Sequence, residues 1–183
     1  RNFATKGPAS TAEQLSKFKM RSQENPVHMD MYKMLGVQAV AKPTSEVLPS
    51  LNTGIVDGFD NTALFSLAAG WIEPVTHYTL SKHIYQPAAV VYSKVFLDKL
   101  PPDLKKIVLG DPFAESARGR SAVRALEGEL LEAIRSMGKQ VIEITPEQRA
   151  ALKAKTRAVH KSFLANHREL IPVYKQVLTK LDD

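Results

Sequence analysis

The feature that most constrains the fold is the alternation of short apolar runs with amphipathic segments over residues 18–70. Runs at residues 18–22, 37–41 and 55–59 have the length and composition of β-strands. Each is followed by a segment whose apolar residues recur at helical spacing, and glycines end the first two of these segments. The order strand, helix, strand, helix, strand, helix predicts a mainly parallel sheet with helices on its faces.

Polar residues mark where several of these helices begin. Ser10 followed by Glu13 predicts a capped short helix through residue 17. Pro26 is expected to start the next helix. Asn61 is the expected N-cap of a helix over residues 62–70.

The second half of the chain has a different pattern. Asp111-Pro112 should interrupt the helix that Pro101-Pro102 starts. Apolar residues spaced by three or four then indicate an amphipathic helix ending at Gly138, and Thr145-Pro146 starts a further long helix. The stretch 80–93 is instead rich in β-forming residues, so strand structure is expected there.

The composition excludes several classes of protein. Cysteine is absent, which removes disulfides, thiolate catalysis and zinc–thiolate sites and fits either the cytoplasm or the periplasm. No apolar run approaches the roughly 20 residues that span a bilayer. The chain begins without an initiator methionine, so we expect an upstream portion to precede it.

The net charge of +6 raises the possibility of a nucleic-acid-binding module. Residues 1–101 carry 10 basic and 8 acidic side chains, and residues 102–183 carry 15 and 11. The excess is therefore spread along the chain, and its densest group, around Lys153 and Lys161, is interleaved with apolar positions on a helix. A solvated helix face explains this pattern better than a nucleic-acid surface.

Catalytic and metal-binding signatures are absent from the sequence. There is no glycine-rich phosphate loop, no Gly-x-Ser-x-Gly and no His-Glu-x-x-His. The five histidines lack metal-ligand spacing, and no cofactor is expected. Asp57 and Asp60 flank a turn, where aspartate usually hydrogen-bonds the backbone.

One arginine stands at a place where α/β proteins bind ligands. Arg21 lies at the carboxyl end of a predicted strand, and ligands of open α/β sheets bind at such ends. A guanidinium offers a planar fork of donors that suits a carboxylate, and a helix N-terminus near Asn61 favours the same negative charge. On spacing alone Arg21 could equally be a surface residue and Asn61 a plain helix cap.

Several segments together resemble the solute-binding proteins of tripartite ATP-independent periplasmic (TRAP) transporters, the DctP-like family. The resemblance covers residues 1–165, and its most specific part is a Ser-Glu-Val followed by Leu-x-Thr-Gly-x-Val-Asp-Gly. The matching segments are Lys19-Met20-Arg21, Met34-Leu35-Gly36, Pro43-Thr44-Ser45-Glu46-Val47, Leu51–Gly58, Asp60-Asn61, Lys82–Tyr85 and Leu100–Ile107.

The resemblance implies the residues of a ligand site. By position, Arg21 is the arginine that forms a salt bridge with the ligand carboxylate, and Asn61 contacts the same group. Arg1 falls where the family often has a second arginine, and His83 matches a histidine that supports the site. Thr44 replaces a bulky apolar or aromatic residue that walls the ligand, which implies a wider or more polar pocket. Thr62 also stands where the family usually has proline.

The resemblance also implies the architecture and the partners. The fold is then an α/β, periplasmic-binding-protein-like lobe with C-terminal helices, and the N-terminal lobe is largely missing. Residues 1–101 form the ligand-binding lobe with inter-lobe strands, and residues 102–183 form a long helix, a short strand and C-terminal helices.

The expected protein is a periplasmic receptor that delivers a carboxylate-bearing small molecule to membrane subunits. A lone lobe exposes surface that the rest of the protein would cover, so we expect the fragment to self-associate. Two rival functions stay open: a small α/β enzyme, for which no nucleophile or base pair is found, and a nucleic-acid-binding module, which would bind with steep salt dependence.

Overall fold

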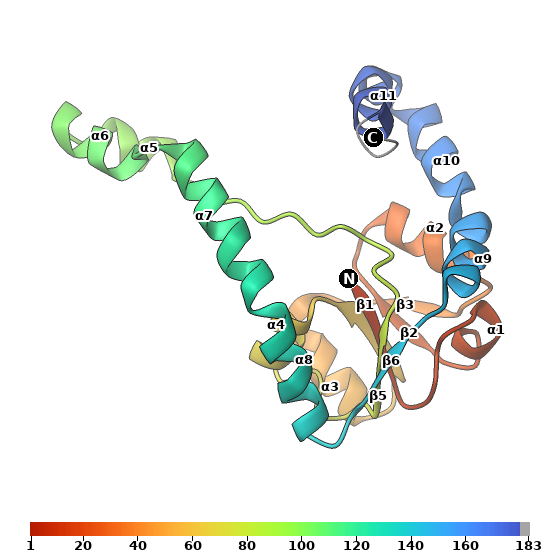
Figure 1. The fold of residues 1–183 in the computed structure, drawn as a ribbon. Helices are drawn as coiled ribbons and strands as arrows, with labels where there is room; N and C mark the ends of the chain where they lie inside the picture. The colour runs from red at the N-terminus through yellow and green to blue at the C-terminus, as the bar shows by residue number, and fades with distance from the viewer. Residues whose placement is uncertain (180–183) are drawn as a thin grey trace.

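A six-stranded sheet forms the centre of the protein in a computed structural model that describes residues 1–179 (Figure 1). Along the sheet the strand order is β3-β2-β4-β1-β5-β6. The strands are β1 (Asn2–Thr5), β2 (Met20–Ser22), β3 (Ala39–Ala41), β4 (Gly58–Asn61), β5 (His77–Leu80) and β6 (Gln140–Glu143).

The sheet is mainly parallel, as the alternating sequence pattern predicted. β2 pairs in parallel with both β3 and β4, and β5 pairs in parallel with β6. β1 lies between β4 and β5 and is antiparallel to both. This strand was not predicted from the sequence, because four residues without alternation give no periodic signal.

Helices cover both faces of the sheet. On one face α3 (Val47–Asn52), α4 (Ala63–Ala68) and α8 (Glu127–Ser136) pack on Phe59, Trp71 and Tyr78. On the other, α1 (Ala12–Leu15), α2 (Pro26–Met34), α9 (Pro146–Thr156) and α10 (Ala158–Asn166) pack around Phe3 and Met20. The strands therefore contribute buried side chains to two separate cores, one on each face of the sheet.

The sheet is closely packed where β4 begins. Gly58 pairs with Thr5 of β1 and Met20 of β2. A Cβ atom at Gly58 would lie 2.4 Å from the carbonyl oxygen of Ala4 and 2.9 Å from the Met20 sulfur. Only glycine fits there, which explains the Asp-Gly turn at the start of β4.

Two helix caps differ from prediction by one residue. Thr11, rather than Ser10, caps α1, and its side chain accepts a hydrogen bond from the Gln14 N–H. Thr62, rather than Asn61, caps α4, and its hydroxyl accepts from the Phe65 N–H. Asn61 is the last residue of β4, because pairing with Asn2 of β1 extends that strand.

The stretch 81–93 contains no strand, so the prediction of strand structure beyond Leu80 was wrong. In Figure 1 it runs as an extended connection from β5 to α5 (Lys94–Asp98). Strand-forming residues need a hydrogen-bonding neighbour, and residues 85–93 are all exposed. Within residues 1–179 they therefore lack the partner that a strand requires.

After α5 the chain forms an arm that reaches away from the sheet (Figure 1). The arm comprises α6 (Pro102–Leu109) and α7 (Pro112–Ala125), and α8 returns to the sheet. The predicted interruption at Pro112 is confirmed, with Asp111 capping α7. Large apolar side chains on the connection, on α5 and on this arm are exposed, among them Tyr85, Val90, Val91, Tyr92, Val95, Phe96, Ile107 and Phe113.

The C-terminal part is largely helical, as predicted. Thr145 and Gln148 form a capping box at the start of α9. α10, the 3-10 helix η2 (Arg168–Leu170) and α11 (Ile171–Thr179) follow, and the rest of the predicted 102–183 unit, residues 180–183, lies outside the described residues. Through Thr179, no helix is both long and apolar enough to cross a membrane.

Candidate functional site

The sheet topology gathers the predicted site residues at one edge. β2, β3, β4 and β5 all end at this edge, and antiparallel β1 begins there, with Asn2 opposite Asn61. Ligands of α/β proteins bind where parallel strands end. Arg1, Arg21, Asn61 and His83 all lie at or directly beyond these ends.

Arg21 is a buried guanidinium without a counter-ion among residues 1–179. Its residue is 3% exposed, and its Nε and Nη2 donate to the Lys42 carbonyl at 2.9 and 2.7 Å. The guanidinium carbon lies 5.4 Å from the centre of the Trp71 ring, so the charge is placed against an aromatic face. Burial lowers the pKa of Arg21 from its ordinary value.

The donors of Arg21 are only partly used. A guanidinium has about five N–H groups, and the Lys42 carbonyl receives two of them. No acidic side chain of residues 1–179 lies within ion-pair distance of Arg21, and Nη1 donates to none of their oxygens. The arrangement thus leaves a charged group able to bind an anion.

Asn61 has a free amide group at the same edge. Its Oδ1 accepts from the Thr62 N–H at 2.9 Å, and its carbonyl accepts from the Tyr78 hydroxyl at 3.1 Å. These bonds fix the side chain and the backbone. The Nδ2 group donates to no described protein atom, so it can donate to a ligand.

Asp60, which precedes Asn61, points to the face of the sheet on which α2 packs, and four side chains contact its carboxylate there. Its Oδ1 accepts from the Tyr32 hydroxyl at 2.8 Å and lies 2.8 Å from His28 Nε2. Its Oδ2 accepts from Arg1 Nη1 at 3.3 Å and lies 3.5 Å from His83 Nε2. The expectation that Asp60 serves the backbone was wrong, whereas Asp57 does accept from the Lys19 N–H at 3.0 Å.

These contacts determine the charge of the cluster. Burial alone would raise the pKa of Asp60, but the contacts with His28 and His83 hold it well below its usual range. Burial and the neighbouring Asp60 raise the pKa of Tyr32 well above its ordinary value. Burial lowers the pKa of His83. At neutral pH Asp60 is therefore an anion, compensated by Arg1, while Tyr32 and His83 are neutral.

Arg1 and His83 are both held by side chains besides Asp60. Arg1 Nε donates to Gln86 Oε1 at 2.7 Å. The His83 ring stacks on Phe3 with ring centres 4.0 Å apart, and its Nδ1 lies 2.7 Å from the Ser81 hydroxyl. Asp60 thus joins the two residues into one cluster.

Thr44 lies apart from this cluster. It is exposed and begins η1 (Thr44–Glu46), two residues after Lys42, whose carbonyl accepts from Arg21. No hydrogen bond joins the Thr44 hydroxyl to a described residue. Because Lys42 contacts Arg21, Thr44 lies closer along the chain to Arg21 than to the cluster around Asp60.

Sequence reasoning missed three residues of the site: Asp60, His28 and Tyr32. His28 and Tyr32 are four residues apart, so they share one face of α2. Two polar side chains at that spacing on an otherwise apolar helix face need a polar partner in the core, and this pattern could have indicated the buried acidic residue that they contact.

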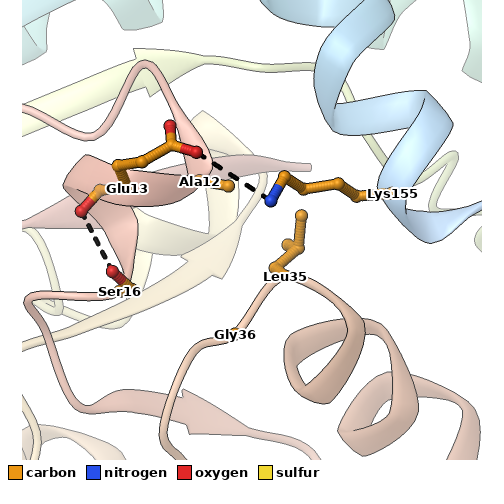
Figure 2. A pocket seen from close by; sticks show the side chains of 6 residues that line it. All are labelled: Ala12, Glu13, Ser16, Leu35, Gly36 and Lys155. Carbon is orange, nitrogen blue, oxygen red and sulfur yellow. Dashed lines mark hydrogen bonds and ion pairs between the residues drawn. The ribbon is translucent and has the colours of Figure 1, made fainter.

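Two shallow depressions are lined by residues of α1 and α9. Figure 2 shows one between α1, the end of α2 and α9, lined by Ala12, Glu13, Leu35 and Lys155, with Glu13 and Lys155 3.9 Å apart. Its volume is about 160 Å³ and its neighbour's about 270 Å³, below the roughly 300 Å³ at which ligand sites begin. Among residues 1–179, no group of histidine and acidic side chains could hold a metal ion.

Comparison with known proteins decides the family. Residues 1–167 match the model of the family described as "Bacterial extracellular solute-binding protein, family 7", DctP. The chain belongs to this DctP-like family of TRAP solute-binding proteins. The resemblance inferred from the sequence is therefore confirmed.

Individual relatives agree with this assignment. The C4-dicarboxylate-binding periplasmic protein DctP of Rhodobacter capsulatus is 32% identical over 84% of this chain and 46% of its own length. A TRAP solute-binding protein from Sulfitobacter, solved with β-D-galacturonate, is 25% identical with a TM-score of 0.83 over 92% of this chain and 56% of its own. One from Citrobacter koseri, solved with D-glucuronate, is 31% identical with a TM-score of 0.77 over 94% and 56%.

The fold class inferred from the sequence is confirmed by the same neighbours. The chain spans about half the length of the curated relatives that it matches. The relatives named here are binding proteins rather than enzymes.

Proposed function

We propose that this chain supplies part of the ligand site of a TRAP-transporter receptor that captures a carboxylate-bearing small molecule. The observation that carries the proposal is Arg21, a buried guanidinium with no acidic partner among residues 1–179 and with unused donors. An isolated buried charge is costly, and an incoming carboxylate offsets that cost. A guanidinium also matches the planar geometry of a carboxylate.

The charges around Arg21 favour the same ligand. Arg1 and Asp60 compensate each other at 3.3 Å, and Lys42 is paired with Glu46 at 2.8 Å. Among the described residues Arg21 thus lacks a compensating charge, whereas Arg1 and Lys42 each have one. Asn61 Nδ2 adds a neutral donor from the neighbouring strand β4, and Thr44 adds a free hydroxyl near Lys42.

The chemical class is supported by what the relatives bind. Galacturonate, glucuronate and C4-dicarboxylates all carry carboxylates. Other relatives are named as ectoine- and 2,3-diketo-L-gulonate-binding proteins. The family therefore accommodates several scaffolds, and we propose a carboxylate without assigning its scaffold.

The proposed receptor works outside the cytoplasm, in the periplasm, and delivers its ligand to the membrane subunits of the transporter. Relatives with periplasmic in their names support this location. Residues 1–101 are proposed as the ligand-binding lobe and residues 102–183 as the helical unit that joins it to the rest of the protein.

A ligand screen tests the function. Isothermal calorimetry with the full-length gene product should detect binding of at least one of D-galacturonate, D-glucuronate and succinate, because each can offer a carboxylate to Arg21. The neutral sugars D-galactose and D-glucose are matched controls and should not bind measurably. Equal binding of a uronate and its neutral sugar would contradict the role of the carboxylate.

The exposed apolar arm gives a separate prediction for the chain on its own. Expressed alone, residues 1–183 should self-associate, because Val91 and Phe113 are 84% and 87% exposed and apolar patches of this kind drive association. Sedimentation velocity over a range of concentrations measures this. The double variant Val91→Glu, Phe113→Glu should shift the chain toward monomer. A wild-type fragment that stays monomeric at every concentration would contradict the proposal.

A further inference from the structure

α2 contributes two polar side chains to a single oxygen of Asp60. The Tyr32 hydroxyl donates to Oδ1 at 2.8 Å, and His28 Nε2 lies 2.8 Å from the same atom. Both residues are buried, at 0% and 6% exposure. Since α2 occupies Oδ1, the other oxygen, Oδ2, is directed to Arg1 and His83.

A hydrogen bond to Nδ1, the ring nitrogen of His28 that does not face Asp60, determines the tautomer of the ring. The Gln23 N–H donates to His28 Nδ1 at 3.0 Å. A ring nitrogen that accepts a hydrogen bond carries no proton, so in this arrangement the proton lies on Nε2, beside Asp60. Nε2 lies 2.8 Å from Asp60 Oδ1 without the alignment of a full hydrogen bond, and it forms no hydrogen bond with any other described residue. The His28 ring therefore connects Gln23, in the loop after β2, to the Asp60 carboxylate that contacts Arg1.

We propose that His28 is a positioning residue for Arg1 and that it acts through Asp60. The expected effect of His28 on ligand binding rests on the proposed function, whereas its effect on Arg1 does not. The terminal torsion of an aspartate side chain is broad, so each additional contact on Oδ1 further limits the rotation of the carboxylate. His28 and Tyr32 hold Oδ1 in place. Oδ2 then stays 3.3 Å from Arg1 Nη1, and the guanidinium is kept at the edge where the ligand binds.

Two substitutions separate the two contacts of the ring. In His28→Asn, the amide oxygen can still accept from the Gln23 N–H, but the side chain is too short to reach Asp60. In His28→Gln, the amide nitrogen can take the place of Nε2 and restore that contact. Because both are polar and differ by one methylene, they form a matched pair, and circular dichroism checks that each is folded.

The first measurement needs no ligand. In the full-length gene product, the Arg1 guanidinium N–H signal in NMR spectra should be slow to exchange in wild type, because Asp60 holds the group. His28→Asn should speed that exchange at least several-fold, and His28→Gln should restore most of the protection. An Arg1 signal unchanged in folded His28→Asn would overturn the inference.

The second measurement is a double-mutant cycle with D-glucuronate, or with the tightest-binding acid of the panel of three. His28→Asn should weaken binding about tenfold, because the close polar contact with the charged Asp60 carboxylate is lost. When Arg1 has already been replaced by methionine, adding His28→Asn should weaken binding by less than about a further twofold, because His28 acts through Arg1. Additive losses would overturn the inference. Failure of all three acids to bind wild type would instead count against the proposed function, and the NMR measurement would still decide the role of His28.

Discussion

Arg21→Met should weaken binding of the carboxylate ligand by about 2–5 kcal/mol, the range for removing one partner of a buried, hydrogen-bonded charge pair. Methionine keeps an apolar stem to pack near Trp71, so the loss reports the guanidinium rather than the packing. Calorimetry on the full-length gene product measures it. Removing a buried charge that lacks an acidic partner in residues 1–179 should leave the ligand-free fold intact.

Related variants define the geometry of this contact. Arg21→Lys should recover only part of the affinity, because an ammonium cannot offer two parallel donors. Asn61→Ala should cost less than Arg21→Met, about 1–3 kcal/mol, because it removes a neutral group. Arg118→Met, on the exposed surface of α7, is the matched control and should bind like wild type. If folded Arg21→Met also binds like wild type, the carboxylate is not held at this edge.

The parts of the site that could be predicted from the sequence are those with local signals. Arg21 follows an apolar strand and stands in a specific family pattern, and Asn61 follows a compact turn. The structure places both at the ends of adjacent strands, β2 and β4. For Asn61 the prediction of a helix cap was wrong by one position, because Asn61 and Thr62 are adjacent and the pairing of β1 with β4 makes Asn61 a strand residue.

The parts that could not be predicted depend on contacts distant in sequence. Asp60 meets Arg1, 59 residues earlier, only because β1 inserts between β4 and β5. His28 and Tyr32 reach it because α2 packs on that face of the sheet. Neither arrangement has a periodic signature in the chain, so the turn next to Asp60 suggested a backbone role.

The stretch 81–93 shows the opposite error. Its β-forming residues give a local signal, but β-structure depends on pairing more than on intrinsic preference. Leu80 has β6 as a neighbour, whereas Val90 and Val91 are each 84% exposed. Within residues 1–179 this segment therefore remains extended and unpaired.

Asp60→Asn should destabilise the protein by about 3–5 kcal/mol at pH 7, as expected when one partner of a buried ion pair is removed. The substitution keeps the size of the side chain but leaves the Arg1 guanidinium without its compensating charge. The amide also presents an N–H₂ group to donors from His28 and Tyr32. Urea unfolding of the full-length gene product measures the change, with the exposed Asp98→Asn as a control of equal charge.

The pH dependence identifies the charge as the cause. Because the folded-state pKa of Asp60 lies well below the unfolded value of about 3.9, ionised Asp60 stabilises the folded state fully above that unfolded value. This contribution is lost as the pH falls below 3.9 toward the folded-state pKa. The stability difference between wild type and Asp60→Asn should therefore shrink as the pH falls below about 3.9, while Asp98→Asn follows wild type more closely throughout. If the difference stays constant on acidification, Asp60 stabilises the fold through its shape and hydrogen bonds, and its charge does not balance Arg1.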